Sequence, residues 1–536
     1  MNKNTIILNC NSIYFVFDWI ILSTKFRRGS DKLYLAGIDI GTTGCKCSVY
    51  DDEGNFFMEE YEEYRIHITK EEHTIDAEVV WEGIKSVIKK ITRQIQSIEA
   101  ICVTSFGEAS VLLDKDGTVL DKSYLFTDPN GQEECDEITA TVGRDYIYEN
   151  TGIAPGKMYS VCKWCWQKRH KPEIWKKVKY ICLFEDYIVY KLTGVRQIDY
   201  SLATRTMAFD IYSLEWDTKI LDAAEIDVSM LSKVVPIGAK AGNMSLQITE
   251  ELGFMNRPVI VSGCHDQIAA AIGSGVFNER HGVDGTGTVE CITVAFSKDQ
   301  KIDKMLLQKS GFAIVPYMKD LFVTYAFSYT GGALLKWYRD KVSPMEAKEA
   351  YENGQNPYEV YNRGVSDGEP SELLILPYFA GAGTPYMDNS AKGIIAGLTM
   401  DTSKEKIYQG IMEGCSYEMK LNLDYLQKAG IAVEKLFATG GGANSKEWLH
   451  IKADIYDKEI ISLGAAESGT VACILLAGVA CGRFRNLEEA SKVFITYRDT
   501  YFPRKGVKEK YKKLFDQLNS YHKPKKYVLV PKKYKK

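Results

Sequence analysis

The chain has 536 residues, of which 45% are hydrophobic and 26% are charged, and its formal net charge is −4 at pH 7. One hydrophobic core rarely serves a chain of this length, so the sequence predicts two domains. The ordinary composition excludes a disordered or fibrous chain, and the small negative charge gives no electrostatic support for nucleic acid as a partner.

Thirteen cysteines are scattered along the chain without the spacing of a disulfide framework. This distribution favours reduced thiols and a cytoplasmic location. The pair Cys162 and Cys165 has no second pair at zinc-site spacing. We therefore favour ordinary thiols over a metal or redox site there.

The two ends of the chain differ from the rest. The apolar run 13–22 is shorter than the ~20 residues of a membrane-spanning helix, and no small-residue cleavage site follows it. We therefore expect residues 1–32 to be an extension outside the fold, with no membrane partner. The lysine-rich residues 511–536 are expected to form a solvated basic tail, with weak contact to an anionic surface as the alternative.

The first half of the chain opens with strands and then turns helical. Apolar runs and turn residues predict the strands 33–40, 45–50, 56–61, 100–103 and 111–113, with one helix, 79–95, before the fourth. Residues 130–230 are expected to be mainly helical. A strand at 258–263 then leads into a helix that begins at Asp266.

The strand pattern starts again near residue 278, where we place the domain boundary. The second half has predicted helices at 404–429 and 468–476, and a strand at 435–439 that runs into a triple glycine. No linker rich in proline or serine marks the boundary, so the two domains, 33–277 and 278–510, should lie close together.

One type of turn occurs in both halves. Gly41-Thr42-Thr43-Gly44 and Gly285-Thr286-Gly287-Thr288 each join two predicted strands. In a P-loop or Rossmann turn a helix must follow the glycines, so neither motif fits. Backbone N–H groups and small hydroxyls in such turns suit phosphate oxygens. The pair of turns suggests a duplicated fold that holds one nucleotide from both sides.

Three further positions have a functional and an ordinary interpretation. Asp39 ends the first strand and can hold Mg²⁺ through water, or cap a turn. Asp266 can act as a general base in phosphoryl transfer, or as a helix N-cap. Gly440-Gly441-Gly442 can lie flat against a nucleotide base, although many strand–helix turns contain glycines.

Taken in order, these motifs resemble the FGGY family of carbohydrate kinases, from about Leu33 to about residue 500. The resemblance rests on Gly37-Ile38-Asp39-Ile40-Gly41-Thr42-Thr43-Gly44 followed by Lys46, on Asp266, on Gly285-Thr286-Gly287-Thr288 and on Gly440-Gly441-Gly442-Ala443. Supporting stretches are 192–194, 203–206, 329–337 and 384–398. The resemblance implies an α/β fold of two actin-like, ribonuclease-H-like ATPase domains with a cleft between them.

The resemblance also implies an ATP- and Mg²⁺-dependent sugar or polyol kinase and a set of roles. Sugar would bind mainly to the first domain and ATP mainly to the second, with no nucleic acid partner and a homodimer as an open alternative. Asp266 would be the catalytic base and Asp39 the metal-associated aspartate. The expected ATP contacts are Thr42, Thr43, Lys46, Gly285, Thr286, Gly331, Gly332, Gly441 and Gly442. The expected substrate contacts are Glu108, Asp128, Tyr159 and Gln267.

Departures from the family pattern cluster in the sugar pocket. Ser105-Phe106 stands where many members have Gly-Gln or Asn-Gln, Asn130 replaces an arginine, and Met158 stands where glycerol kinases use a tyrosine. The remaining carboxylates would repel an anionic substrate, and Phe106 and Met158 would add apolar surface. We therefore expect a neutral ketopentose, deoxyketose or polyol and disfavour glycerol and gluconate. The alternatives are a catalytically weak sensor of sugar and ATP and an actin- or chaperone-like ATPase.

Overall fold

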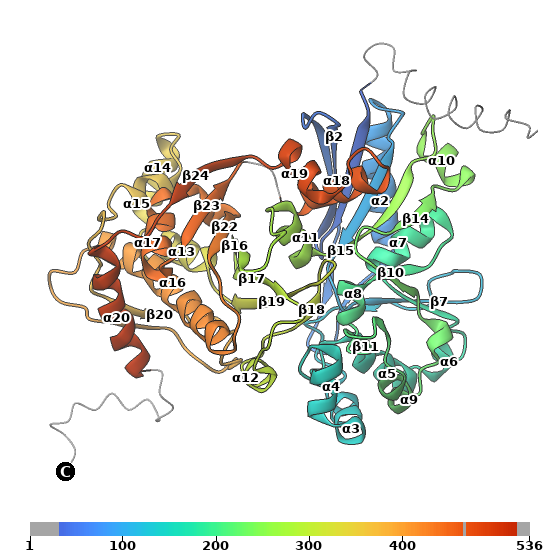
Figure 1. Ribbon diagram of the computed structural model, residues 1–536, viewed down its shortest axis with the longest axis horizontal. Helices are drawn as coiled ribbons and strands as arrows, with labels where there is room; N and C mark the ends of the chain where they lie inside the picture. The colour runs from blue at the N-terminus through green and yellow to red at the C-terminus, as the bar shows by residue number, and fades with distance from the viewer. Residues whose placement is uncertain (1–31, 465–467, 522–536) are drawn as a thin grey trace, which may run out of the picture.

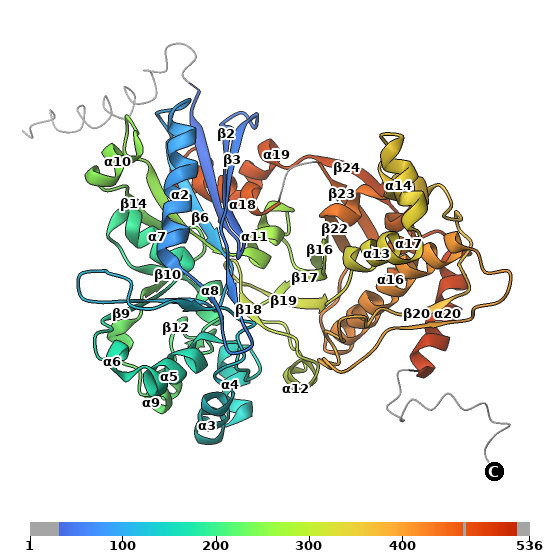
Figure 2. The same cartoon turned by 180° about the vertical axis from the view of Figure 1, so that it is seen from behind.

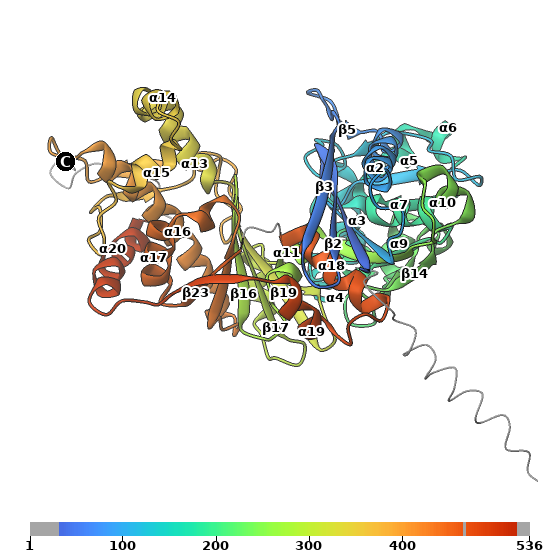
Figure 3. The same cartoon turned by 90° about the horizontal axis from the view of Figure 1, so that it is seen from above.

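The computed structural model describes residues 32–464 and 468–521, which form two lobes built on separate β-sheets (Figure 1). This arrangement confirms the expected mixed α/β fold with two domains. Seen from above, the lobes face each other across β16, β17 and β19, with α11 beside the junction (Figure 3).

The first lobe is built on a six-stranded sheet of order β14-β15-β6-β1-β2-β3. Strands β1, β2 and β3 form the expected antiparallel meander, β6 and β15 continue it in parallel with β1, and β14 closes the edge antiparallel to β15. The bounds are β1 Tyr34–Ile40, β2 Gly44–Asp51, β3 Phe56–Glu63, β6 Ala100–Ser105, β14 Lys240–Asn243 and β15 Val259–His265.

The second lobe repeats this plan in a seven-stranded sheet of order β18-β19-β17-β16-β22-β23-β24. Here β19, β17 and β16 form the meander, β22 and β23 run parallel to β16, and β24 is the antiparallel edge. The bounds are β16 His281–Thr286, β17 Glu290–Ser297, β18 Val315–Pro316, β19 Leu321–Ser328, β22 Lys435–Thr439, β23 Glu459–Leu463 and β24 Tyr497–Tyr501. Since β1 and β16 occupy equivalent places, the two Gly/Thr turns are equivalent as well.

The remaining elements surround these sheets. The helices of the first half are α2 Ala77–Thr92, α3 Gln132–Val142, α4 Arg144–Thr151, α5 Ser160–His170, α6 Pro172–Trp175, α7 Phe184–Thr193, α8 Tyr200–Thr204, α9 Thr218–Ala224, α10 Leu246–Leu252 and α11 Asp266–Gly273. Those of the second half are α12 Lys304–Lys309, α13 Gly332–Trp337, α14 Pro344–Glu352, α15 Pro357–Asn362, α16 Lys404–Lys428, α17 Lys446–Tyr456, α18 Ser468–Ala480, α19 Leu487–Phe494 and α20 Val507–Tyr521, with the short helical turns η1 Val228–Met230, η2 Tyr338–Val342 and η3 Gly441–Asn444.

Small sheets of two or three strands complete the fold. They are β4 His67–Ile68 with β5 His73–Ile75 and β8 Ser123–Tyr124, β7 Ser110–Leu113 with β9 Tyr180–Leu183, β10 Gln197–Asp199 with β13 Lys233–Val235, β11 Phe209–Asp210 with β12 Glu215–Trp216, and β20 Leu374–Leu376 with β21 Ile394–Ala396.

Apart from Asp39 near its end, strand β1 is apolar because helices cover both of its faces. Ala36, Ile38 and Ile40 belong to one core cluster together with residues of α2 and α7. Leu35 belongs to the other cluster, which includes α18. Burial on both faces explains why the sequence of β1 shows no polar alternation.

Helix α18 crosses from the second half of the chain to the first lobe. It packs on β1, β6 and α11, and Figures 1 and 2 show α18 and α19 beside the blue strands of the first lobe. A Cβ atom at Gly37 would lie 2.6 Å from Cys473 Cβ, and Arg483 Nε lies 2.6 Å from Asp52 Oδ2. The division at residue 278 stays a prediction, and α18 is a part of the second half whose apolar face is buried by the first sheet.

The expected solvated basic tail, 511–536, is wrong for residues 511–521, which are helical. Residues 507–521 form α20, and Tyr511, Phe515 and Leu518 are buried against the second lobe. The ring of Phe515 stacks on Tyr417 with centroids 5.9 Å apart. The lysines lie on the outer face of an amphipathic helix, and the apolar residues lie on its inner face. The prediction of a tail relied on the number of lysines and overlooked the apolar residues between them.

Parts of both expected terminal segments lie outside the described residues. This holds for residues 1–31 of the extension and 522–536 of the tail. Within the described ranges, no helix combines the length and the apolar character needed to cross a lipid bilayer.

Candidate active site

The first Gly/Thr turn is closed by a short backbone bond and braced by a tyrosine. Gly41 N donates to Gly44 O at 2.9 Å, and the Tyr64 hydroxyl donates to Gly41 O at 2.6 Å. Between them, Thr42 is half-buried and Thr43 is exposed. The turn is therefore rigid at its base and presents its threonines outward.

Asp39 and Lys46 face each other across the β1–β2 pair. The Lys46 Nζ atom lies 3.8 Å from Asp39 Oδ2. Burial raises the pKa of Asp39 to about 6, which Lys46 opposes and the nearby Asp266 reinforces. A Cβ atom at Gly469 would lie 3.3 Å from Asp39 Oδ2, so the start of α18 approaches this carboxylate.

Asp266 is the first residue of α11, directly after the buried strand β15. His265, and not Asp266, occupies the N-cap position, so the ordinary N-cap interpretation of Asp266 does not hold. Burial raises the pKa of Asp266 to about 6, although 43% of its side-chain surface stays exposed. A carboxylate that is accessible and titrates near neutral pH suits proton transfer.

His265 is a neighbour of Asp266 that the sequence did not single out. Its Nε2 atom lies 3.2 Å from Asp266 Oδ1. Burial and the charge of Arg205 lower the pKa of His265 to about 3, so the ring is neutral at pH 7. His265 therefore adds no positive charge beside Asp266.

Glu108 is held by an arginine that the sequence analysis treated only as part of a supporting stretch. Arg205 Nε donates to Glu108 Oε1 at 2.7 Å, and Arg205 Nη2 also donates to that oxygen. The guanidinium lies 5.2 Å from the ring centroid of Tyr159. Glu108, Tyr159 and Arg205 therefore form one buried cluster, and its cation offsets the charge of Glu108.

Asp128 does not stand free in a pocket as expected. Its side chain is fully buried and lies 3.1 Å from Lys163 Nζ, and it accepts backbone N–H bonds from His73 and Asn130. The Asp128 carboxylate therefore links Lys163 to the backbone at His73 and Asn130. The expected contact of Asp128 with substrate stays a prediction, and the structure adds that its oxygens have protein partners.

Phe106 also differs from the expectation. It is 5% exposed, and its ring lies 4.9 Å from the ring of Phe184 in the core. It therefore offers no apolar face to a substrate. Met158, by contrast, is half-buried.

A cavity of about 540 Å³ lies between the lobes beside the second Gly/Thr turn. Its walls come from α11, β16, β17, β22, η3 and the start of α18. The lining residues are Gln267, Ala270, Val283, Gly285, Thr286, Gly287, Val289, Cys291, Thr293, Ala438, Thr439, Gly440, Gly441, Ala443, Asn444, Leu463, Gly464, Ser468 and Gly469. A Cβ atom at Gly441 would meet nothing within 4 Å, so it would project into open space. The cavity wall is thus bare backbone at Gly441, as the nucleotide interpretation expects.

The other expected nucleotide glycines pack beneath this wall. Gly331 N donates to Thr288 O at 3.2 Å, and Gly332 N donates to Gly287 O at 2.8 Å. A Cβ atom at Gly442 would lie 2.6 Å from Thr286 Cγ2. These three glycines allow α13 and η3 to approach the second turn closely, and they do not line the cavity itself.

A buried ionic cluster below the second turn was missed by the sequence analysis. Lys452 Nζ lies 2.7 Å from Asp284 Oδ2 and 2.8 Å from Glu290 Oε1. Asp284 and Glu290 raise the pKa of Lys452 against the opposing effect of burial. Since Lys452 lies 168 residues from Asp284 along the chain, no local pattern signals the pair.

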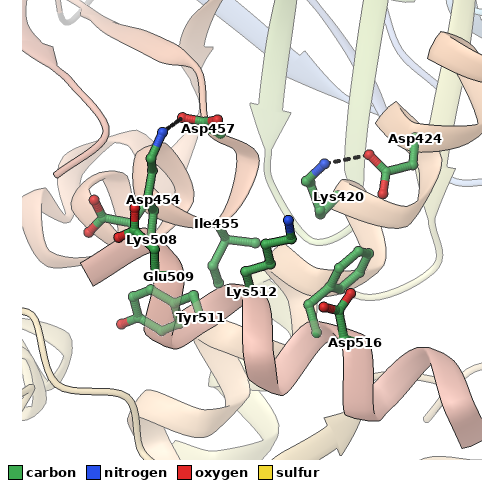
Figure 4. A pocket seen from close by; sticks show the side chains of 11 residues that line it. Lys420, Asp424, Asp454, Ile455, Asp457, Lys508, Glu509, Tyr511, Lys512 and Asp516 are labelled. Carbon is green, nitrogen blue, oxygen red and sulfur yellow. Dashed lines mark hydrogen bonds and ion pairs between the residues drawn. The ribbon is translucent and has the colours of Figure 1, made fainter. Parts of the chain in front are cut away.

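A second, charged pocket of about 350 Å³ lies between α16, α17 and α20 (Figure 4). Lys508 pairs with Asp457 and Lys420 pairs with Asp424 along its walls. It shares no lining residue with the cavity between the lobes, so it is separate from the candidate active site.

The residues near the cavity fit a hydrated divalent cation better than a fully protein-bound one. Among residues 32–464 and 468–521, no group of three or more His, Cys, Asp or Glu side chains is placed to hold a metal. Mg²⁺ keeps several waters and binds through one or two carboxylates together with substrate phosphates. Asp39 supplies such a carboxylate next to the first turn.

Comparison with known proteins gives consistent matches over most of the chain. Residues 34–273 match the family model described as the N-terminal domain of the FGGY family of carbohydrate kinases, and residues 286–481 match the model of its C-terminal domain. The chain is 26% identical over 491 residues to the xylulose kinase of Bacillus subtilis (strain 168), covering 90% of this chain and 95% of that protein.

Two further proteins show the same breadth of similarity. The glycerol kinase of Ligilactobacillus salivarius (strain UCC118) is 27% identical over 488 residues, covering 88% of this chain and 93% of that protein. The crystal structure of a gluconate kinase from Lactobacillus acidophilus superposes with a TM-score of 0.82 at 23% identity, covering 91% of this chain and 97% of the other. At this identity the structural likeness shows the fold.

Proposed function

Because the chain belongs to the FGGY family of carbohydrate kinases, we propose that it transfers the γ-phosphoryl group of ATP to a terminal hydroxyl of a neutral sugar, with Asp266 as the general base. Members of this family are phosphotransferases that use ATP with Mg²⁺. The observation that carries the proposal is Asp266 itself: its pKa is raised to about 6, and it opens a helix whose next residue, Gln267, lines the cavity between the lobes.

In the proposed reaction, Asp266 accepts the proton of the substrate hydroxyl while that oxygen bonds to the γ-phosphorus and ADP departs. The N-terminus of α11 stabilises the ionised carboxylate, which the base requires. The neutral His265 ring leaves the proton affinity of Asp266 undiminished. Gln267, the next residue of α11, would hold the substrate.

The two turns are proposed to bind the polyphosphate from opposite sides. Thr42, Thr43 and Lys46 would serve from the first lobe, and Gly285 and Gly441 from the second. Asp39 would hold Mg²⁺ through water, and that cation would offset charge on the transferring phosphoryl group. We further propose that the first lobe, with α18 and α19, binds sugar and that the second lobe binds ATP.

The substrate class is proposed to be neutral, but for a different reason from the expected excess of carboxylates. Arg205 offsets Glu108 and Lys163 offsets Asp128, so neither carboxylate repels an acid. The same pairing leaves Arg205 engaged with Glu108 and not free to bind an acid. Asp39 and Asp266 remain as the nearby carboxylates, which favours a neutral, hydroxyl-rich substrate. The first substrate proposed is a ketopentose such as xylulose, which is the substrate in the name of one relative.

A coupled ADP-release assay tests the proposal with xylulose, ribulose, fuculose, erythritol, glycerol and gluconate. We expect the highest kcat/KM with a ketopentose or deoxyketose. A tenfold preference for glycerol or gluconate would refute the substrate class and leave the kinase activity standing. Absence of turnover together with retained binding of sugar and ATP would instead support the weak-sensor alternative.

A further inference from the structure

A buried ammonium lies directly beneath the second Gly/Thr turn, with all of its donors engaged. Lys452 Nζ donates to Thr286 Oγ1 at 2.6 Å and to Asp284 Oδ2 at 2.7 Å, and it lies 2.8 Å from Glu290 Oε1. Its side chain is 2% exposed. An ammonium has three N–H groups, so these three partners account for all of them.

The same contacts fix the side chain of Thr286. Its Oγ1 atom accepts the bond from Lys452 and donates to Asp284 Oδ1 at 3.2 Å. A hydroxyl has one proton, so Thr286 has none left for a phosphate oxygen. With the oxygen held toward the interior, the methyl group Cγ2 faces Gly442, where a Cβ atom would lie 2.6 Å away.

This arrangement links Lys452 to the shape of the cavity. Thr286 and Gly285 line it from β16, and Gly440 and Gly441 line it from the segment that packs on Thr286. A different rotamer of Thr286 would push its methyl group out of the space beside Gly442. The packing of η3 on the second turn therefore depends on where the Thr286 hydroxyl is held.

We infer that Lys452 is a positioning residue for nucleotide binding, which acts by holding Thr286 so that the second turn and η3 keep the form of the nucleotide wall. The inference rests on the proposed function, because it assumes that this cavity receives ATP. It assigns the Thr286 side chain a supporting role, so that the turn contacts phosphate through its backbone.

The variant that tests this inference must leave the formal charge of the cluster unchanged. Lys452→Met alone would strand Asp284 and Glu290 in the interior, which strongly destabilises proteins. Burial already raises the pKa of Glu290 to about 7 against the opposing effect of Lys452. The double variant Lys452→Met with Glu290→Gln removes one charge of each sign, so the formal charge of the cluster is unchanged and Asp284 keeps the Thr286 hydroxyl as a partner.

The experiment is calorimetric titration of the full chain with ADP in the absence of sugar, followed by kinetics with ATP. In the double variant we expect ADP to bind about tenfold more weakly, the loss of one hydrogen bond from a charged donor. The KM for ATP should rise by a similar factor, and the KM for sugar should stay within twofold of the wild type.

Lys163→Met is the matched control. Lys163 is also 2% exposed and also pairs with a fully buried aspartate, but in the first lobe. This variant should lower the melting temperature and leave ADP affinity within twofold. Thr286→Ser, which keeps the hydroxyl, should retain more ADP affinity than Thr286→Val, which keeps the shape and loses the bond to Lys452.

The outcomes separate the inference from the proposed function. If the wild-type chain binds ADP and the folded double variant binds it equally well, Lys452 has a structural role and the inference is overturned. If Thr286→Val binds ADP as well as Thr286→Ser does, the link through Thr286 is overturned. A wild-type chain that binds no ADP would overturn the proposed nucleotide site itself.

Discussion

The pH dependence of turnover gives a quantitative test of Asp266 as the base. With a pKa of about 6, the Asp266 carboxylate is about 90% ionised at pH 7 and about 10% ionised at pH 5. A general base must be deprotonated to accept a proton, so activity should fall as the pH falls. We expect kcat/KM to drop about tenfold between pH 7 and pH 5, with the midpoint near pH 6.

Asp39 must be separated from Asp266 in this measurement, because burial raises the pKa of Asp39 to about 6 as well. The profile should therefore be recorded at saturating Mg²⁺, which favours the ionised form of a carboxylate beside it. Asp39→Asn is the control. This variant should need more Mg²⁺ for full activity, and its pH profile should keep the acidic limb, which is the fall in kcat/KM toward low pH. Asp266→Asn should lower turnover by ~10²–10⁴-fold and leave ADP affinity within twofold.

Two results would refute the assignment. One is an acidic limb that disappears in Asp39→Asn and remains in the residual activity of Asp266→Asn. The other is an Asp266→Asn variant that keeps more than about a tenth of wild-type turnover, since loss of a general base costs more than that.

Three other predictions follow from the packing. Gly37→Ala should lower the free energy of unfolding, measured by chemical denaturation, by about 1–3 kcal/mol, because its Cβ atom would lie 2.6 Å from Cys473 Cβ. Gly156→Ala should lower it little. Equal stability of the two variants would contradict the packing of α18 on β1. Lys163→Met should lower the free energy of unfolding by about 3–5 kcal/mol by leaving Asp128 buried without its cation, and an unchanged denaturation midpoint would contradict this. Small-angle scattering should show a smaller radius of gyration with ATP analogue and sugar together, because turns on both lobes bind one polyphosphate, and identical curves would count against closure.

The local elements of the fold were predictable from the sequence, because their signals are local. The strand predicted at 435–439 coincides with β22, and the helix predicted at 404–429 differs from α16 by one residue. Both Gly/Thr turns follow their strands as expected. Alternating burial and turn chemistry are properties of neighbouring residues, which a single sequence displays.

The partners of the site residues were not predictable, because they are distant in sequence. Glu108 and Arg205 are 97 residues apart, and Asp284 and Lys452 are 168 residues apart. Asp128 matched the expected pattern of a substrate residue, yet Lys163 from α5 engages it. A motif indicates which side chain is present, whereas its role depends on which side chains the fold brings against it.

The crossing of α18 is a further case of tertiary context. Its sequence predicts a small-residue helix that packs closely on a sheet, and it does so, but on the sheet of the first lobe. Nothing in residues 468–480 indicates which of the two equivalent sheets receives them. That choice depends on the close approach permitted by Gly37 and Gly273, both of which lie in the first lobe.

The most direct test of the account is a single measurement on the wild-type chain: release of ADP from ATP and Mg²⁺ with and without xylulose, together with the mass of the sugar product. The account predicts that ADP release requires the sugar, that one ADP forms for each sugar consumed, and that the product gains one phosphoryl group. ATP hydrolysis that proceeds equally without sugar, and yields no phosphorylated product with any sugar or polyol of the panel, would contradict it.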